Sequence, residues 1–185
     1  MITLDLFKSV IDLLLQILKI RKDSRYAEKQ IQKVVDTYDA MLLMSSLTDI
    51  HRVLILKIEN SGGLIDPKVP IYATVIHEDY REPTASVKSR YIRLPVDQDY
   101  VRTIHSAITD TCFCIKVSDM AEGLLKVFYK HEGIKAAEIC YLGSNSKAIF
   151  IMSVASATTD AVFTTDEYKA NRLVAINNIK RALWN

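Results

Sequence analysis

The sequence predicts an α+β fold, in which a mostly antiparallel central sheet is flanked by helices and preceded by an N-terminal helical extension. Apolar residues recur with helical spacing at both ends of the chain, whereas its middle carries short, continuous apolar runs that are typical of buried strands. Two of these runs, 135–142 and 148–155, are joined by a Gly-Ser-Asn turn, which is a hairpin signature. Helices at both ends of strands connected in this way indicate an α+β domain.

Residues 1–23 are predicted to form a separate apolar helix. One polar stripe, which includes Asp5, Lys8 and Asp12, interrupts an otherwise apolar helical surface. So wide an apolar face must be covered on both flanks, by the chain's own domain, by a partner chain or by lipid. The stripe is not rich in lysine or arginine, which disfavours lipid. The candidate interface residues of this helix are Leu6, Val10, Leu14 and Leu18.

This N-terminal segment lacks the pattern of a signal peptide or a membrane span. Its basic cluster, Lys19 with Arg21 and Lys22, follows the apolar run instead of preceding it, and charged residues interrupt that run. A membrane-spanning helix requires about 20 residues almost free of charge. We therefore expect a cytoplasmic protein that does not associate with a membrane.

Residues 24–185 are predicted to form the domain itself. Asp23 or Ser24 caps its first helix, which runs to about Ser46 and ends beneath the sheet. The inner side of this helix is predicted to consist of Ala27, Ile31, Val34, Val35, Tyr38 and Leu42, with Met41 beside them.

The remaining elements follow from changes in the hydrophobic period. The run 53–58 predicts a strand covered on both faces, and 71–76 predicts a second strand. A long loop then leads to a short edge strand within 89–94. The later elements are a helix over 97–108, a strand over 112–117, a helix capped by Ser118 or Asp119 that ends at Gly133, the hairpin, and a last helix opened by the capping box Thr164-x-x-Glu167.

Charge, histidines and cysteines exclude several kinds of site. The 185 residues include 24 Lys and Arg and 22 Asp and Glu, a formal net charge of +2, so no basic surface for duplex nucleic acid is indicated. No two of the four histidines have a metal-ligand spacing, so no metal site is expected. The odd number of cysteines does not indicate a disulfide framework. We expect Cys112, Cys114 and Cys140 to be small buried hydrophobes in a reducing compartment.

Four stretches, in their order and spacing, resemble a GAF-type domain. They are 52–60 with the Ser-Gly-Gly that follows, 115–119, 133–142 with 147–155, and 163–167. The resemblance runs from about Tyr26 to Leu183. It implies a small-molecule sensor with a pocket between the sheet and the middle helices, and terminal helices that pack against a second subunit.

Cyclic nucleotides are not the expected ligand. The GAF-type domains that bind them carry an adjacent Asn-Lys pair and three residues between a Phe and an Asp-Glu pair. Here Ser146 separates Asn145 from Lys147, and only two residues separate Phe163 from Asp166. The identities of a ligand and of a cofactor stay open. The candidate pocket residues, which include tyrosines for stacking and arginines for anions, are Arg90, Tyr91, Arg93, Tyr100, His105, Asp119, Tyr129 and Glu138.

We expect a non-enzymatic module that binds a small molecule or a partner protein and forms a homodimer through its terminal helices. Two alternatives stay open. An oligomeric structural or adaptor protein without a ligand would fill its pocket with side chains. A reductase of free methionine sulfoxide, an activity found in some GAF-type proteins, would use Cys112, Cys114 and Cys140 as thiols close to a positive group.

Overall fold

The computed structural model describes residues 4–60 and 68–184, without the side chains of residues 4–18, 20 and 21. The predicted interface side chains of Leu6, Val10, Leu14 and Leu18 therefore lie outside the described residues. The helices are α1 (Leu4–Ser45), α2 (Gln98–Asp110), α3 (Leu124–His131) and α4 (Asp166–Trp184), with the 3-10 helices η1 (Val117–Asp119) and η2 (Ala161–Thr164). The strands are β1 (Arg52–Asn60), β2 (Ile71–Tyr80), β3 (Leu94–Pro95), β4 (Cys112–Lys116), β5 (Ala136–Ser144) and β6 (Ala148–Ser156).

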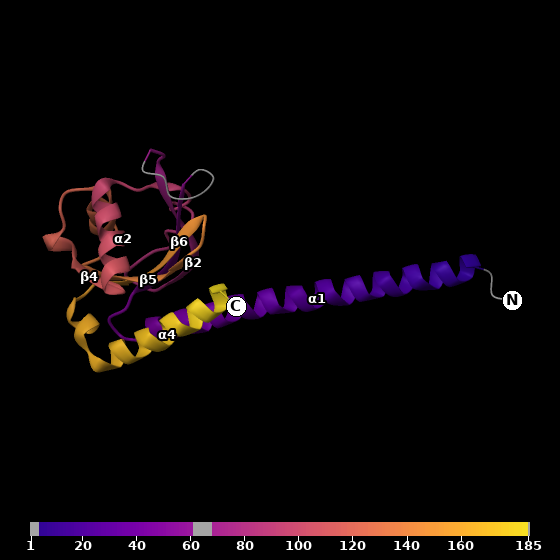
Figure 1. Ribbon diagram of the computed structural model, residues 1–185. Helices are drawn as coiled ribbons and strands as arrows, with labels where there is room; N and C mark the ends of the chain where they lie inside the picture. The colour runs from indigo at the N-terminus through magenta and orange to yellow at the C-terminus, as the bar shows by residue number, and fades with distance from the viewer. Residues whose placement is uncertain (1–3, 61–67, 185) are drawn as a thin grey trace.

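The strands form one six-stranded sheet in the order β3-β2-β1-β6-β5-β4. Figure 1 shows this sheet beside α4 and the end of α1. Every pair of neighbours is antiparallel. β5 and β6 form the predicted hairpin. β1 and β6, which lie far apart in the sequence, pair at the centre of the sheet. The predicted α+β fold with an antiparallel sheet is confirmed.

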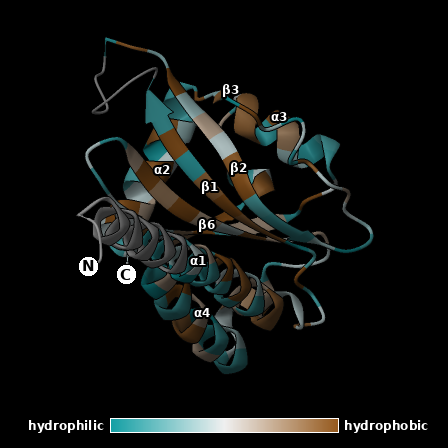
Figure 2. Cartoon of the chain, turned by 90° about the vertical axis from the view of Figure 1, so that its right-hand side faces the viewer, coloured by the Kyte–Doolittle hydropathy of each residue, from teal (hydrophilic) through white to brown (hydrophobic). Residues whose placement is uncertain are grey.

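The sheet separates two layers of helices (Figure 2). One face, called here the α1/α4 face, packs against α1 and α4; the other, the α2/α3 face, packs against α2 and α3. Side chains of β1 alternate between them, with Val53 and Ile55 on the α1/α4 face and Leu54 and Leu56 on the α2/α3 face. The prediction that this strand is covered on both faces is confirmed.

α1 is one continuous helix of 42 residues, so the predicted helix break at Asp23 or Ser24 is wrong. No glycine or proline lies in this stretch, and a single Asp or Ser lowers helix propensity by well under 1 kcal/mol. The N-terminal half of α1 projects beyond the sheet and α4 (Figure 1). The proposed boundary between residues 1–23 and 24–185 falls inside this helix.

The end of α1 lies beneath the sheet, as predicted, but the predicted inner side is right only for Met41 and Tyr38. The buried stripe consists of Thr37, Ala40, Met41 and Met44. The other predicted residues face outward, and the exposed fractions are 65% for Ile31, 43% for Val34, 43% for Val35 and 53% for Leu42. This part of α1 has two apolar stripes, and the domain covers one of them.

Asp97 caps two helices at once. Its Oδ1 accepts a hydrogen bond from the Tyr100 N–H at 2.8 Å at the start of α2, close to the predicted boundary. Its Oδ2 accepts from the Leu124 N–H at 2.7 Å at the start of α3. The predicted cap of α3 at Ser118 or Asp119 is therefore wrong, because a carboxylate from a distant loop satisfies that helix end.

Two other element boundaries shift by a few residues. The hydroxyl oxygen of Thr165, not of Thr164, accepts from the Tyr168 N–H at 3.2 Å at the start of α4. The predicted edge strand within 89–94 is reduced to Leu94–Pro95. Among the described residues, no helix is both long and apolar enough to span a membrane.

The end of α4 packs on the β5–β6 hairpin through Trp184. Its Nε1 donates to the Leu142 carbonyl at 3.3 Å, and its ring meets the edge of Phe150 with the ring centroids 5.4 Å apart. Gly143 has a φ of +138°, and a Cβ there would lie 2.8 Å from Trp184 Nε1. A glycine is therefore required at this turn, both for its backbone conformation and to leave room for the indole.

Candidate functional site

Four of the eight predicted pocket residues lie near one another around the α2/α3 face. Tyr91, Tyr100 and Tyr129 are buried in its apolar cluster, and Arg90 lies at the rim. The Tyr129 hydroxyl lies 3.4 Å from Ser153 Oγ on β6. Helix α2, helix α3 and the loop that precedes β3 therefore meet over the centre of the sheet.

A buried ion pair lies among these tyrosines. Arg52, at the start of β1, is 1% exposed and its guanidinium lies 2.6 Å from the carboxylate of Glu132, which follows α3. The Tyr91 hydroxyl donates to Glu132 Oε1 at 3.1 Å, and the half-exposed Arg90 lies 3.7 Å from the same oxygen. The Nε of Arg52 has no hydrogen-bond partner in the part of the chain that the structure describes.

Burial sets the protonation of the three tyrosines. It raises the pKa of Tyr91, Tyr100 and Tyr129 above the usual value of 10.0. For Tyr91 the charge of Glu132 acts in the same direction. All three are therefore neutral hydroxyls at physiological pH. They pack within the apolar cluster between the sheet and the helices, and a hollow of about 310 Å³ lined by Arg90, His131 and Glu132 opens at the rim of that cluster.

The other four predicted pocket residues lie elsewhere. The guanidinium of Arg93 lies 4.5 Å from the ring centre of Tyr72 on β2, and His105 is exposed on α2. Asp119 lines a separate hollow of about 310 Å³ between α2 and α3. Glu138 lies on the opposite face of the sheet. The structure thus does not bring the eight residues into one pocket.

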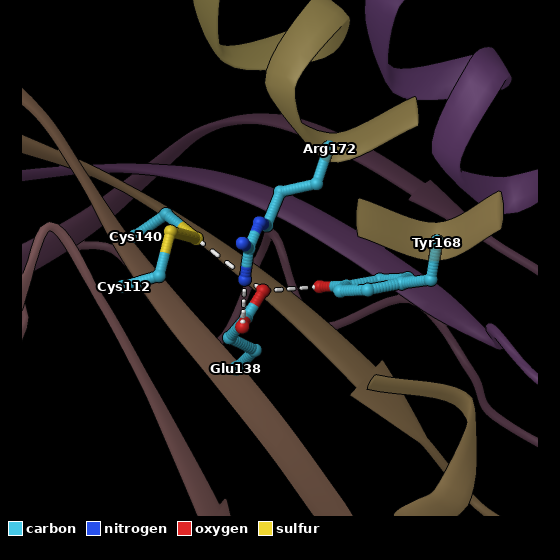
Figure 3. The surroundings of a disulfide bond; sticks show 5 residues. All are labelled: Cys112, Glu138, Cys140, Tyr168 and Arg172. Atoms are coloured by element: carbon cyan, nitrogen blue, oxygen red, sulfur yellow. Dashed lines mark hydrogen bonds and ion pairs between the residues drawn. A yellow bond between two sulfur atoms is a disulfide. The ribbon is translucent and has the colours of Figure 1, made fainter. Parts of the chain in front are cut away.

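Glu138 is the centre of a buried polar cluster between β5 and α4 (Figure 3). Its carboxylate is 5% exposed; Oε2 accepts from the Tyr168 hydroxyl at 2.5 Å, and Oε1 pairs with Arg172 at 2.5 Å. Desolvation raises the pKa of Glu138, although the Tyr168 hydrogen bond and the Arg172 charge act against it. One carboxylate of the sheet therefore holds two side chains of α4.

Cys112 and Cys140 form a disulfide beside this carboxylate, so the expectation that they are unpaired hydrophobes is wrong (Figure 3). They are directly opposite in the β4–β5 register, and their Cα atoms are 4.0 Å apart. In the sequence, Cys112 is two residues from Cys114 on one strand, and two such residues do not normally form a disulfide. The partner comes from the neighbouring strand, and only the register identifies it.

Cys114 is the free cysteine of the described residues and is exposed rather than buried. Partial desolvation raises its pKa to about 11, and the charges of Glu138 and Asp160 act in the same direction. It is therefore a thiol of low reactivity at neutral pH. The sulfurs of Cys112 and Cys140 and the carboxylate of Glu138 lie within 4.8 Å of one another, but the disulfide and the Arg172 guanidinium already occupy these groups.

A hollow of about 470 Å³ lies between β4, α3, the residues before β5 and the residues after β6. Three lysines and one aspartate are its charged residues: Lys116, Lys130, Lys135 and Asp160. Lys116 pairs with Asp160 at 2.8 Å, and Lys130 lies 3.7 Å from Glu122. Lys135 has no ion-pair partner among the described side chains, so the lining carries a net positive charge.

No family model and no curated protein matches the sequence, but solved structures match the fold and confirm the GAF-type resemblance. The chain is similar to a far-red cyanobacteriochrome photoreceptor, with a TM-score of 0.58 and 16% identity over 92% of this chain and 97% of that chain. It is also similar to the phycocyanobilin-bound GAF domain of a cyanobacterial phytochrome, with a TM-score of 0.55 and 11% identity over 88% of this chain and 90% of that chain. A third similar structure is the GAF domain of a two-component sensor histidine kinase from Bacillus halodurans, with a TM-score of 0.54 and 10% identity over 82% of this chain and 90% of that chain. This chain has the GAF fold.

The sequence analysis of this GAF fold did not identify Arg52, its partner Glu132 or the three lysines of the large hollow as site residues. Arg52 carries a usable signal, because a charge at the start of a continuous apolar strand needs a buried partner. The sequence gives no comparable signal for its partner Glu132. The three lysines of the large hollow come from β4, α3 and the residue before β5, so no spacing in the sequence relates them.

Proposed function

We propose that this chain is a sensory and interaction module that forms a homodimer through α1 and α4. The observation that carries the proposal is the apolar surface that these two helices leave uncovered. α1 and α4 pack against each other and the sheet with one side only. The exposed large apolar residues of the two helices are Tyr26, Ile31, Val34, Val35, Leu42, Leu173, Val174 and Trp184.

A second copy of the chain is the occupant that fits this surface. In a two-fold contact the same patch meets itself, so the exposed stripe of α1 and that of α4 are covered in one step. The projecting half of α1 adds to the argument, because a helix in water depends on packing of its apolar side for most of its stability. Its sequence includes the candidate interface residues Leu6, Val10, Leu14 and Leu18.

The oligomeric state tests this proposal. We expect native mass spectrometry of the full chain to give twice the 21.0 kDa of one copy. Ile31→Glu combined with Leu173→Glu should raise the dimer dissociation constant at least about a hundredfold, because each side chain loses roughly 1.5–3 kcal/mol of burial and occurs twice in a two-fold contact.

The matched control is Ile92→Glu, since Ile92 is as exposed as Ile31 but lies in a loop away from the two helices. It should leave the dimer intact. A monomeric wild-type chain, or a dimer that survives the Ile31→Glu and Leu173→Glu substitutions, would contradict the proposal. Leu14→Glu with Leu18→Glu extends the same test to the projecting half of α1.

The lysine-lined hollow favours a second function, the binding of a small organic or inorganic anion. Its volume of about 470 Å³ is in the range of small-ligand sites. Its lining includes three lysines, of which Lys135 has no ion-pair partner among the described side chains, together with Ser118, Thr158 and Thr159. A phosphate-bearing molecule has the charge and the acceptor oxygens that this set of donors would bind.

Titration with inorganic pyrophosphate, followed by calorimetry, tests the anion site. Lys130→Gln with Lys135→Gln should weaken pyrophosphate binding at least about tenfold, which corresponds to two lost charge-assisted contacts. Lys147→Gln, an exposed lysine in the β5–β6 turn, should leave the affinity unchanged. Equal losses in both variants would show a non-specific charge effect and contradict the site. A cytoplasmic location remains part of the proposal.

A further inference from the structure

The Cys112–Cys140 disulfide lies at an unusual place for a structural bridge. It joins two adjacent strands that the backbone ladder already holds together. Cys140 is fully buried on the α1/α4 face, whereas Cys112 is half-buried on the edge strand β4. Cys112 is therefore the more accessible of the two cysteines, and the sulfur of Cys140 lies 3.5 Å from the carboxylate that holds α4.

Glu138 connects this bond to α4. Its Oε2 lies 3.5 Å from Cys140 Sγ and accepts the Tyr168 hydroxyl on the same atom, while Oε1 holds Arg172. With the disulfide intact, Cys140 has no S–H and cannot donate to that oxygen. In the reduced protein the thiol gains a proton and can donate to it. Reduction thus introduces a competitor for the oxygen that binds α4.

We propose that Cys112 and Cys140 form a reversible thiol–disulfide site whose redox state is transmitted to α4 through Glu138. This inference adds a redox input that the proposed dimer and the anion site do not require. The proposal explains why a disulfide occurs in a chain whose third cysteine, Cys114, is free. In the reducing compartment expected for this chain, a disulfide is usually one that opens and closes reversibly.

The reaction balances with a low-molecular-weight thiol such as glutathione. A glutathione thiolate attacks Cys112 Sγ, the S–S bond breaks, and Cys140 leaves as a thiolate that takes up a proton. A second glutathione thiolate attacks the mixed disulfide, which releases Cys112 as a thiol and glutathione disulfide as the oxidised product. Two electrons pass from two glutathiones to the protein disulfide, and oxidation by glutathione disulfide reverses each step.

Neighbouring groups fit these roles. The carboxylate of Glu138 lies 3.5 Å from the leaving sulfur of Cys140, where it can accept a hydrogen bond from the thiol once water has protonated that sulfur. Cys114 lies on the same face of β4, but its pKa of about 11 leaves little thiolate at neutral pH. It is therefore not the attacking group, and Cys114→Ser serves as the control variant.

The experiment follows two signals through one redox titration of the full chain. The protein is equilibrated in glutathione buffers of increasing reduced fraction, quenched with acid and alkylated, and the intact mass counts the free thiols. The fluorescence of Trp184, the single tryptophan, is measured in each equilibrated sample before the quench. It reports the end of α4, because the indole contacts Leu142 and Phe150. We expect two thiols to appear together, and the fluorescence to change with the same midpoint.

Variants separate transmission from direct quenching by sulfur. Cys114→Ser should retain both transitions, and Cys140→Ser should lose both. Glu138→Gln should retain the thiol transition but lose most of the fluorescence change, whereas direct quenching would survive this substitution. A disulfide that stays closed, or stays open, across the whole range of buffers would overturn the proposal. So would a full thiol transition in the wild-type chain with no change in Trp184 fluorescence. The oligomeric state of each sample is recorded separately, so failure of the dimer does not affect either readout.

Discussion

Replacing Glu132 with glutamine is expected to lower the free energy of unfolding by about 3–5 kcal/mol, because it leaves the Arg52 guanidinium buried without a counter-charge. Arg52 is 1% exposed and its partner carboxylate 4% exposed, so solvent does not screen the remaining charge. For a chain of this size the melting temperature should fall by roughly 6–20 °C. Urea unfolding at a fixed protein concentration measures the loss and keeps any dimer contribution constant.

Arg90→Gln is the matched control for this prediction. Arg90 lies 3.7 Å from the same carboxylate, but its side chain is 48% exposed, so its removal should cost less than about 1 kcal/mol. The double variant Arg52→Met with Glu132→Leu should recover most of the stability that Glu132→Gln loses, because no charge remains buried. Similar losses for Arg90→Gln and Glu132→Gln would show that the buried pair has no special role.

The sequence predicted the strands well because their signal is local. The apolar run of β1 and the turn between β5 and β6 are written into adjacent residues, and both elements form where expected. Helix ends were less predictable when the capping group came from elsewhere. Asp97 caps α3 from a position 27 residues earlier in the chain, so the nearer candidates Ser118 and Asp119 were chosen in error.

The candidate site was predictable only in part, because it depends on the face to which each residue belongs. Tyr91, Tyr100 and Tyr129 do meet on the α2/α3 face. Glu138 was assigned to the same pocket, but its neighbours Ala137 and Ile139 take that face, and alternation along β5 turns the carboxylate toward α4. The Cys112–Cys140 pair is set by the register of β4 on β5, which no residue pattern in either strand specifies.

Arg172→Met is expected to destabilise the protein by about 2–3 kcal/mol near neutral pH, and by less as the pH falls toward the ordinary Glu pKa of 4.5. Arg172 is 26% exposed, so the cost is below that of a fully buried pair. Without the guanidinium, desolvation raises the pKa of Glu138 further, and the buried carboxylate is uncompensated wherever it is ionised. Urea unfolding between about pH 4.5 and 8, with the disulfide kept oxidised, measures the difference.

The direction of this pH dependence follows from proton binding. The native pKa of Glu138 lies above its ordinary value of 4.5, so between these two pKa values the native state retains a proton that the unfolded state has released. The contribution of Glu138 to stability is therefore fully present below pH 4.5 and declines as the pH rises through the native pKa. Arg172→Met extends that decline to higher pH, and Glu138→Gln abolishes it.

Lys169→Met, which removes a half-exposed cation from the same helix, should leave the pH profile of stability unchanged. A loss in Arg172→Met that is constant with pH, or that grows as the pH falls, would mean that Glu138 is not the group that the arginine stabilises.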